Sequence, residues 1–367
     1  MKPRRTSKHQ PEQVPGRNLT RREFIPRVTA AALGAGVLLS PDSSSGSVDN
    51  MKHRKLGKTG VSISEIGFGS HLTPQNMGDP QARTAQIRKG LELGINLFDI
   101  YEHTYHQFGL MSEVLGPVRQ DVVLSLVQVW RPSNALEEVE YALKTFDTDV
   151  IDLYRLYTSE GWSKRDRETR LEGLQQAKEQ GKIRAIGMSV HDQKLMVEML
   201  RTYPELDFLM FPYNFRHQKF SPVGYDPDSL PDQTFTGRRD CMMVPCPDPE
   251  FVAQVRERDV GLLAMKPFGA GSLLKLKPSD PRLEPLEDAG VSLPQAALKF
   301  ILQVQEISSA IPAMNSIAEV VENVGAVQGN GLSEPEGQCL QIYNEAAEQS
   351  GGKYLPEEYA WLEKWKV

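Results

Sequence analysis

The sequence predicts an α/β fold, a (β/α)8 TIM barrel with a C-terminal helical extension. Short apolar runs alternate with amphipathic stretches, which is the pattern of a parallel sheet built from strand–helix units. Eight such units fall within about 280 residues, the number and size typical of this barrel. A doubly wound open sheet would carry a Gly-rich phosphate loop after an early strand, and no G-x-G-x-x-G occurs in the chain.

Each predicted strand is a short apolar run, and a stretch with helical spacing follows it. The predicted strands are Glu65–Ser70, Asn96–Tyr101, Val122–Val129, Val150–Leu156, Ile183–Ser189, Phe208–Pro212, Gly261–Lys266 and Ser309–Pro312. The predicted helices are Ala82–Leu93, Leu110–Pro117, Ala135–Thr145, Lys164–Gln180, Gln193–Arg201, Phe251–Arg258, Pro294–Gln303 and Ile317–Val327. A long stretch, 214–248, interrupts this spacing, and loops of that length are usually functional. We expect two further helices after Gly331, at Glu334–Gln349 and Glu357–Lys364.

Composition places the chain among ordinary soluble globular proteins. It is 40% hydrophobic and 25% charged, with a formal net charge of -6. There is no basic patch, so nucleic acid is not an expected partner. No stretch approaches the roughly 20 apolar residues of a membrane-spanning helix, so no stable span is expected. The sequence gives no indication of the oligomeric state.

The first fifty residues differ from the rest, with eight Lys/Arg and four acidic residues. Thr20-Arg21-Arg22-Glu23-Phe24-Ile25 resembles a twin-arginine export signal, and a short apolar run follows from Val28 to Leu39. We therefore expect a signal peptide and linker over 1–50, the barrel over 51–330 and a helical tail over 331–367. The protein would be exported to the periplasm or the extracellular space. The alternative for this segment is a disordered basic tail. Three cysteines are too few for a disulfide framework.

Polar residues cluster where the predicted strands end. This fold places its chemistry at the carboxyl ends of the strands, so these residues are the candidates for the site. Five of the seven histidines are among them. The set is Ser70, His71, Asp99, Glu102, His103, Tyr105, His106, Arg155, Tyr157, Ser189, His191, Asp192, Tyr213, Asn214, Arg216, His217 and Lys266.

Five segments occur in a fixed order: MKHRKLGKTGVSISEIGFGS (51–70), GINLFDIYEHTYHQFGLMSEVLG (94–116), GKIRAIGMSVHD (181–192), GLLAMKPFGAGSLL (261–274) and SSAIPAMNSIAEVVENVGAV (308–327). Together they resemble the bacterial aldo/keto reductases, in which a short hairpin caps the barrel bottom ahead of the first strand. The resemblance implies reversible carbonyl reduction with a nicotinamide dinucleotide. It also implies four catalytic groups: a Tyr that donates the proton, a Lys that lowers its pKa, an Asp that holds the Lys, and a His that orients the carbonyl.

Carried onto this chain, the resemblance keeps two of these four groups. Asp99 matches the Asp, and Tyr105 matches the proton donor if one residue is inserted before it. Val127 or Gln128 stands at the Lys position, and Tyr157 at the His position. Asp99 then needs another donor, for which His103, His106 and Lys266 are the candidates. The predicted catalytic residues are Asp99, Tyr105, His103 and His106, with Tyr101 expected in the wall of the site.

The cofactor positions are also retained in part. Ser189 matches the residue that binds the nicotinamide carboxamide, but Val190, Met210 and Met265 replace its usual companions. Glu319 stands where a basic residue would pair with a 2′-phosphate, so NAD is favoured over NADP. The residues that the resemblance assigns to the cofactor are Ser189, Lys266, Pro267, Phe268, Gly269, Gly271, Glu322 and Asn323. No metal ligand is assigned.

Two alternatives remain open from the sequence. One is a metal-dependent barrel enzyme that uses rim histidines with Asp99 and Glu102, because imidazole and carboxylate groups together suit Zn, Mn or Fe. Its candidate histidines are His71, His103, His191 and His217. The other is a barrel without catalysis that binds a ligand or a partner protein, which the lost catalytic positions favour.

Overall fold

The computed structural model describes residues 51–70, 79–102, 107–128, 135–157, 163–190, 193–215 and 249–349. Eight parallel strands form one sheet, in the order β3-β4-β5-β6-β7-β8-β9-β10. They are β3 (Phe68–Gly69), β4 (Leu97–Glu102), β5 (Val123–Gln128), β6 (Ile151–Tyr157), β7 (Ile183–Ser189), β8 (Phe208–Pro212), β9 (Gly261–Met265) and β10 (Ile307–Ile311). The Gly67 N–H donates to the Ala310 carbonyl at 2.9 Å, and Ile66 bridges Ala310, so the first and last strands meet. The sheet is a closed (β/α)8 barrel, as predicted.

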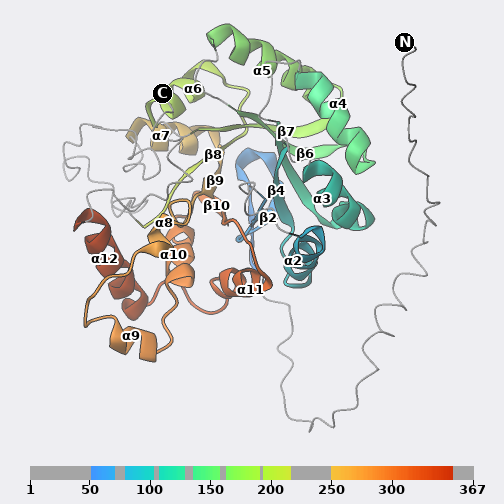
Figure 1. Ribbon diagram of the computed structural model, residues 1–367. Helices are drawn as coiled ribbons and strands as arrows, with labels where there is room; N and C mark the ends of the chain where they lie inside the picture. The colour runs from blue at the N-terminus through green and yellow to red at the C-terminus, as the bar shows by residue number, and fades with distance from the viewer. Residues whose placement is uncertain are drawn as a thin grey trace, which may run out of the picture. The chain divides into compact units, whose positions relative to one another are not determined.

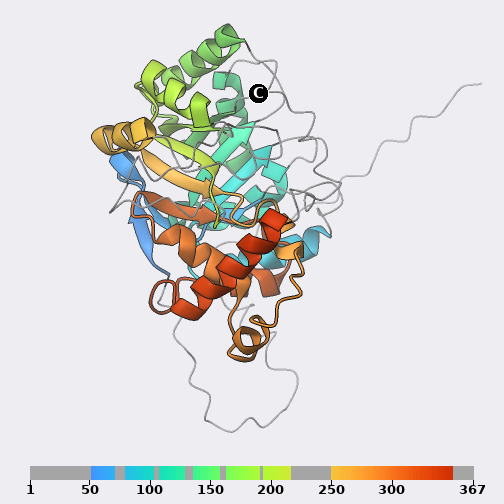
Figure 2. The same cartoon turned by 90° about the vertical axis from the view of Figure 1, so that its left-hand side faces the viewer.

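Helices surround this barrel (Figure 1), and the view turned by 90° shows the same arrangement (Figure 2). The helices between strands are α2 (Pro80–Glu92), α3 (Gln107–Leu115), η3 (Gly116–Asp121), α4 (Ala135–Phe146), α5 (Lys164–Glu179), α6 (Gln193–Thr202), α7 (Pro249–Arg258), α8 (Ser272–Lys275), α9 (Glu284–Asp288) and α10 (Leu293–Leu302). After β10 come α11 (Ile317–Gly325) and α12 (Glu334–Gln349). Several begin at side-chain caps, as at Ser163 before α5 and Ser292 before α10.

The predicted elements agree with the observed ones in type and order, and several bounds differ by a few residues. The first predicted strand, Glu65–Ser70, is regular only at Phe68–Gly69. The short helices α8 and α9 were not predicted, because four or five residues are too few to show helical periodicity. The predicted helix Glu357–Lys364 lies outside the described residues, as does most of the stretch 214–248. Within the described ranges, every helix falls short of the length and apolarity needed to cross a bilayer.

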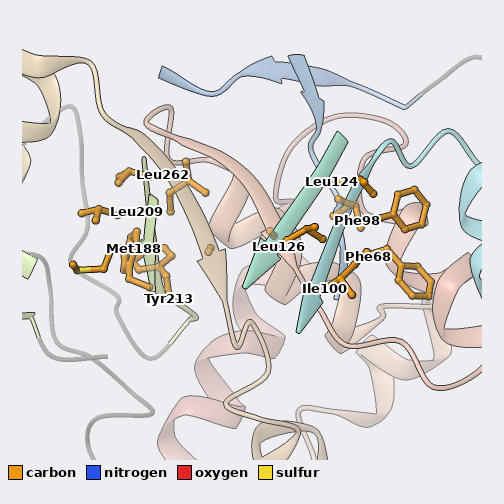
Figure 3. Packing of buried hydrophobic residues seen from close by; sticks show 14 of the residues in the cluster. Phe68, Phe98, Ile100, Leu124, Leu126, Met188, Leu209, Tyr213 and Leu262 are labelled. Atoms are coloured by element: carbon orange, nitrogen blue, oxygen red, sulfur yellow. The ribbon is translucent and has the colours of Figure 1, made fainter. Parts of the chain in front are cut away.

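Among the described residues, two large apolar clusters lie on either side of the barrel wall, and a small third one joins Leu283 and Leu286 to Cys339 and Ile342 of α12. The outer part lies between strands and helices and includes Phe68, Phe98 and Leu126 (Figure 3). The inner part fills the barrel and consists of Leu56, Ile63, Leu97, Val123, Leu153, Ala185, Phe208, Met210, Leu263, Met265 and Ile311. Successive residues of a strand point to opposite faces, so every second residue after an inner one also points into the barrel.

A hairpin closes the amino end of the barrel, as the family resemblance implied. Strand β1 (His53–Lys55) pairs antiparallel with β2 (Ser62–Ser64) around the short helix η1 (Gly57–Thr59). Leu56 and Ile63 are fully buried in the inner core. Arg54 donates to the carbonyls of Leu302, Val304 and Ile307 at 2.7, 3.1 and 2.8 Å, which ties the hairpin to the start of β10. The carboxyl ends of the strands, where this fold places its chemistry, lie at the opposite end of the barrel.

Candidate active site

Asp99 lies inside the barrel, one layer above the apolar bottom. It follows Leu97 by two residues on β4 and is 3% exposed. In the register of the sheet it stands opposite Ser125 of β5, and the Ser125 Oγ donates to Asp99 Oδ1 at 3.0 Å. Strand alternation thus brings a carboxylate and a hydroxyl together at the level where the apolar filling stops.

Arg155 supplies the positive charge beside Asp99. It lies two residues after Leu153 on β6 and is 0% exposed. Its Nη1 donates to Asp99 Oδ1, and also to Ser125 Oγ at 2.7 Å. We expected this donor to be His103, His106 or Lys266; among the described residues, the groups that bond Asp99 are Arg155 and Ser125. A buried carboxylate is stable only with such partners.

Burial and charge pairing shift the pKa values of Asp99 and Arg155 in opposite directions. Burial raises the pKa of Asp99 above its ordinary value, and the Arg155 charge with the hydrogen bonds from Arg155 and Ser125 limits the rise. The pKa of Arg155 is raised, since the pull of Asp99 and Tyr101 on the guanidinium outweighs the effect of burial. The guanidinium therefore stays charged throughout the working range of an enzyme.

Tyr101 forms the next layer toward the carboxyl end. It follows Asp99 by two residues and faces the same way, as the sequence predicted for a wall residue. Its ring centroid lies 5.1 Å from Cζ of Arg155. Burial raises the pKa of the Tyr101 phenol above its ordinary value, and the charge of Arg155 limits the rise. Tyr101 is partly exposed, unlike Asp99 and Arg155.

Ser189 ends β7 and is 1% exposed. β7 is the third strand from β4, which carries Tyr101. Val127 stands opposite Tyr101 in the register and is fully buried, so strand β5 offers an apolar side chain at this level. Tyr157 stands opposite Ser189.

The loop after β9 carries the residues that the resemblance assigns to the pyrophosphate. Lys266, Gly269 and Gly271 have left-handed backbone angles, with φ of 55°, 54° and 84°. The N–H of Gly269 donates to the Lys266 carbonyl at 3.0 Å and that of Gly271 to the Phe268 carbonyl at 2.9 Å, which makes the loop compact. Pro267 and Phe268 are buried, whereas a side-chain atom added at Gly271 would meet nothing within 4 Å. The open side of the loop is thus at Gly271.

Helix α11 carries the residues that the resemblance assigns to adenine. Glu322 is exposed and accepts a hydrogen bond from the Ser292 hydroxyl at 2.7 Å, whereas Asn323 is buried. At the helix start, the Glu319 carboxylate accepts from the Asn315 N–H at 2.7 Å, and the Ser316 hydroxyl accepts from the Glu319 N–H at 3.1 Å. A negative charge is therefore fixed at the amino end of α11.

Arg83 and Gln86 on α2 hold the loop that leads into α11, and sequence reasoning missed both. Arg83 Nη1 donates to the Met314 carbonyl at 2.5 Å and Gln86 Nε2 to the Asn315 carbonyl at 2.7 Å. Arg83 is 4% exposed, and burial lowers its pKa to about 10. Charged residues on a helix face normally indicate solvent contact, so only the structure could find this role.

Several predicted residues lie outside the described part of the chain. They include the catalytic candidates His103, Tyr105 and His106, and the metal candidates His71, His191 and His217. Within the described ranges, no three His, Cys, Asp or Glu side chains gather closely enough to hold a metal ion. The described site therefore consists of the Asp99–Ser125–Arg155 cluster, Tyr101, Ser189, the loop 266–271 and α11.

The profile described as "Aldo/keto reductase family" matches residues 65–221. An aldo-keto reductase from Bacillus halodurans in its holo form superimposes with a TM-score of 0.57 at 25% identity, over 81% of this chain and 97% of that one. The uncharacterized oxidoreductase YqkF of Bacillus subtilis is 23% identical over 333 residues, covering 80% of this chain and 96% of its own length. Over residues 65–221 the chain is similar to the aldo/keto reductase family.

A further solved aldo-keto reductase, from Klebsiella pneumoniae in complex with NADPH, has a TM-score of 0.59 at 20% identity, over 80% of this chain and 95% of that one. At 20% identity this likeness supports the assignment of the fold alone. The buried cation beside Asp99 stands on a different strand from the one that the resemblance implied. The resemblance placed a Lys on the strand that is β5 here, and the structure has Arg155 on β6 instead.

Proposed function

We propose that this protein is a nicotinamide-dependent oxidoreductase that interconverts a carbonyl and an alcohol on a small or sugar-like substrate. The observation that carries the proposal is the buried Asp99–Ser125–Arg155 cluster, which lies inside the barrel beside Tyr101, near the carboxyl ends of the strands. A fixed charge pair at this depth, with a phenol above it, is suited to stabilising charge that develops on a substrate oxygen.

The described residues at and after the carboxyl ends of β7, β9 and β10 fit a dinucleotide. A nicotinamide dinucleotide supplies or accepts the hydride when bound. Ser189 would bind its nicotinamide end, Lys266 and the open side of the loop at Gly271 would lie against its pyrophosphate, and the exposed Glu322 would bind its adenine. Asn323 is buried and fits a packing role in α11 better.

NAD(H) is the preferred form in this proposal. The Glu319 carboxylate is held at the amino end of α11, and it would repel the 2′-phosphate of NADP(H). A Glu319→Arg variant should bind NADPH at least about tenfold more tightly, equal to about 1.4 kcal/mol, with little change for NADH. Fluorescence titration with each cofactor measures this. Glu172→Arg on the exposed surface of α5 is the matched control. Tighter NADPH binding by the unchanged protein than by Glu319→Arg would contradict the preference.

The family resemblance assigns the proton donor to Tyr105, and His103 and His106 are the candidates to replace the catalytic groups that this chain lacks. The reaction itself is tested with DL-glyceraldehyde, which is both a small carbonyl compound and the simplest sugar. We expect NADH oxidation, followed at 340 nm, that depends on the protein and on the aldehyde. Asp99→Asn should reduce kcat strongly while the chain remains folded by circular dichroism.

A native mass spectrum of the purified protein tests the proposed class directly. A dinucleotide adduct supports the oxidoreductase and distinguishes NAD from NADP by mass. A metal adduct without dinucleotide would instead support the metal-dependent alternative. A bare protein that also fails to bind added NADH and NADPH would contradict the proposed function.

Export by the twin-arginine route, to the periplasm or the extracellular space, is a second part of the proposal. It rests on the Arg21-Arg22 motif and the apolar run after it. An exported enzyme is separated from the cytoplasmic cofactor pool, so this protein would retain its dinucleotide tightly. Slow release of bound NADH, measured after gel filtration, is the expected consequence.

A further inference from the structure

Within the described ranges, every hydrogen-bond partner of the Arg83 guanidinium is neutral. Arg83 lies on α2 and is 4% exposed. It donates to the Met314 carbonyl at 2.5 Å, to the Gln86 amide oxygen at 2.9 Å and to the Gly69 carbonyl at 3.4 Å. Its Cζ lies 4.7 Å from the centroid of the Phe68 ring. A charge buried among neutral groups costs free energy, so an apolar side chain would be the more stable choice if packing were its only role.

The carbonyl that Arg83 holds belongs to the same peptide group as the N–H that holds Glu319. The Met314 carbonyl accepts from Arg83 Nη1, and the Asn315 N–H donates to Glu319 Oε2 at 2.7 Å. In a trans peptide the C=O and the N–H point in opposite directions. One planar group therefore has a cation at its oxygen and a carboxylate at its nitrogen, and its dipole is aligned favourably with both charges.

The next peptide group is held as well. Gln86 Nε2 donates to the Asn315 carbonyl at 2.7 Å, while Gln86 Oε1 accepts from Arg83. Ser316 caps α11 and accepts from the Glu319 N–H at 3.1 Å. The connection from β10 to α11 is thus fixed by α2 on one side and by the first turn of α11 on the other. The exposed Glu319 carboxylate is therefore placed by two buried side chains of α2.

We propose that Arg83, supported by Gln86, is a positioning residue that sets the preference of this protein for NAD(H) over NADP(H). It acts through Glu319. By orienting the peptide group between Met314 and Asn315, it keeps the Glu319 carboxylate at the amino end of α11. This inference rests on the proposed function, in which that carboxylate repels the 2′-phosphate of NADP(H). A carboxylate released from the peptide group would move into solvent, where water and salt screen the repulsion.

Fluorescence titration of the full chain with NADH and with NADPH tests the inference. The measured quantity is the ratio of the NADPH Kd to the NADH Kd. Arg83→Met should lower this ratio by at least about threefold, because the repulsion of the 2′-phosphate weakens, and Arg83→Lys and Gln86→Leu should lower it less. Arg88→Met, at an exposed position on the same helix, is the matched control and should leave the ratio unchanged. An unchanged ratio in Arg83→Met would overturn the inference.

A second background separates action through Glu319 from other roles of Arg83. In a Glu319→Gln chain, Arg83→Met should change the ratio by less than about 1.5-fold, since the carboxylate that Arg83 positions is gone. A ratio that rises on loss of Arg83 in both backgrounds would show that the cation acts on the phosphate directly. An equal fall in both backgrounds would show a structural role alone. Either result would overturn the inference and leave the proposed function intact.

Hydrogen exchange tests the peptide contact without any cofactor. Arg83→Met should speed exchange of the Asn315 amide by at least about tenfold, measured by mass spectrometry on a peptide that covers residues 313–319, and Arg88→Met should not. Circular dichroism checks that each variant is folded. Unchanged exchange in Arg83→Met would overturn the proposed contact. Failure of the unchanged protein to bind either dinucleotide would instead refute the proposed function.

Discussion

The pair formed by Asp99 and Arg155 should make a large contribution to stability that depends on both partners. Arg155 is 0% exposed and the Asp99 side chain 4%, so Arg155→Met leaves a buried carboxylate without its counter-charge. Such a loss costs about 3–5 kcal/mol. The remaining hydrogen bond from Ser125, at 3.0 Å, places the expected value near the lower end, at about 3 kcal/mol.

Urea unfolding followed by circular dichroism measures this cost. The double variant Arg155→Met/Asp99→Asn has no buried charge left, so we expect it to be more stable than Arg155→Met alone by about 2 kcal/mol. Arg184 provides the matched control: it pairs with Asp152 at 3.0 Å on the neighbouring strand, but its side chain is 59% exposed. Arg184→Met should cost about 1 kcal/mol or less.

The pH dependence of the stability of Arg155→Met gives an independent check of the Asp99–Arg155 pair. The pKa of Asp99 is already raised by burial, and removing Arg155 raises it further. An acid with a raised folded pKa contributes stability that is present below its unfolded pKa of 3.8 and lost as the pH rises through the folded pKa. The loss of unfolding free energy in Arg155→Met, relative to the unchanged protein, should therefore be smaller at pH 4 than at pH 7. A loss under 1 kcal/mol at pH 7, or an equal loss at both pH values, would refute the charge pair.

Three further predictions concern other parts of the chain. The Tyr154 hydroxyl is buried and lacks a hydrogen-bond partner among the described residues, so Tyr154→Phe should raise the free energy of unfolding by about 1 kcal/mol in urea. Burial raises the pKa of Cys339 from 9.0 to about 11, so in a chain without the other two cysteines iodoacetamide should label it at pH 8 about 100-fold more slowly than in urea; equal rates would contradict this. R21K/R22K should retain the protein in the cytoplasm of an expressing bacterium, and an unchanged periplasmic fraction would refute twin-arginine export.

The fold could be predicted from the sequence because the same pattern, an apolar strand followed by an amphipathic helix, is repeated along the chain. Each apolar run of suitable length was followed by a helical stretch, and β7 and β8 begin and end where the pattern indicated. Asp99 could be found for the same reason, since it stands at a fixed place after an apolar strand. The short helices α8 and α9 lack that redundancy.

The partner of Asp99 could not be predicted in the same way. Arg155 was among the polar residues near the end of its strand, but an Arg there normally points to solvent. Its inward direction follows from the alternation with Leu153, and its contact with Asp99 depends on how three neighbouring strands are staggered. A shift of one residue would turn it outward, so the contact needs the register of the sheet as well as the sequence.

The ties of the amino-terminal hairpin to β10 have a consequence for the order of folding. Arg54 bonds carbonyls that lie 248, 250 and 253 residues further along the chain. The hairpin emerges first from the ribosome, yet its partners are among the last to be synthesised. Closing so long a loop carries a high entropy cost, so the ring of strands is completed late and slowly. Until the barrel closes, Leu56 and Ile63 cannot be buried in its interior. The nascent chain therefore exposes an apolar, aggregation-prone hairpin, a typical binding site for a chaperone.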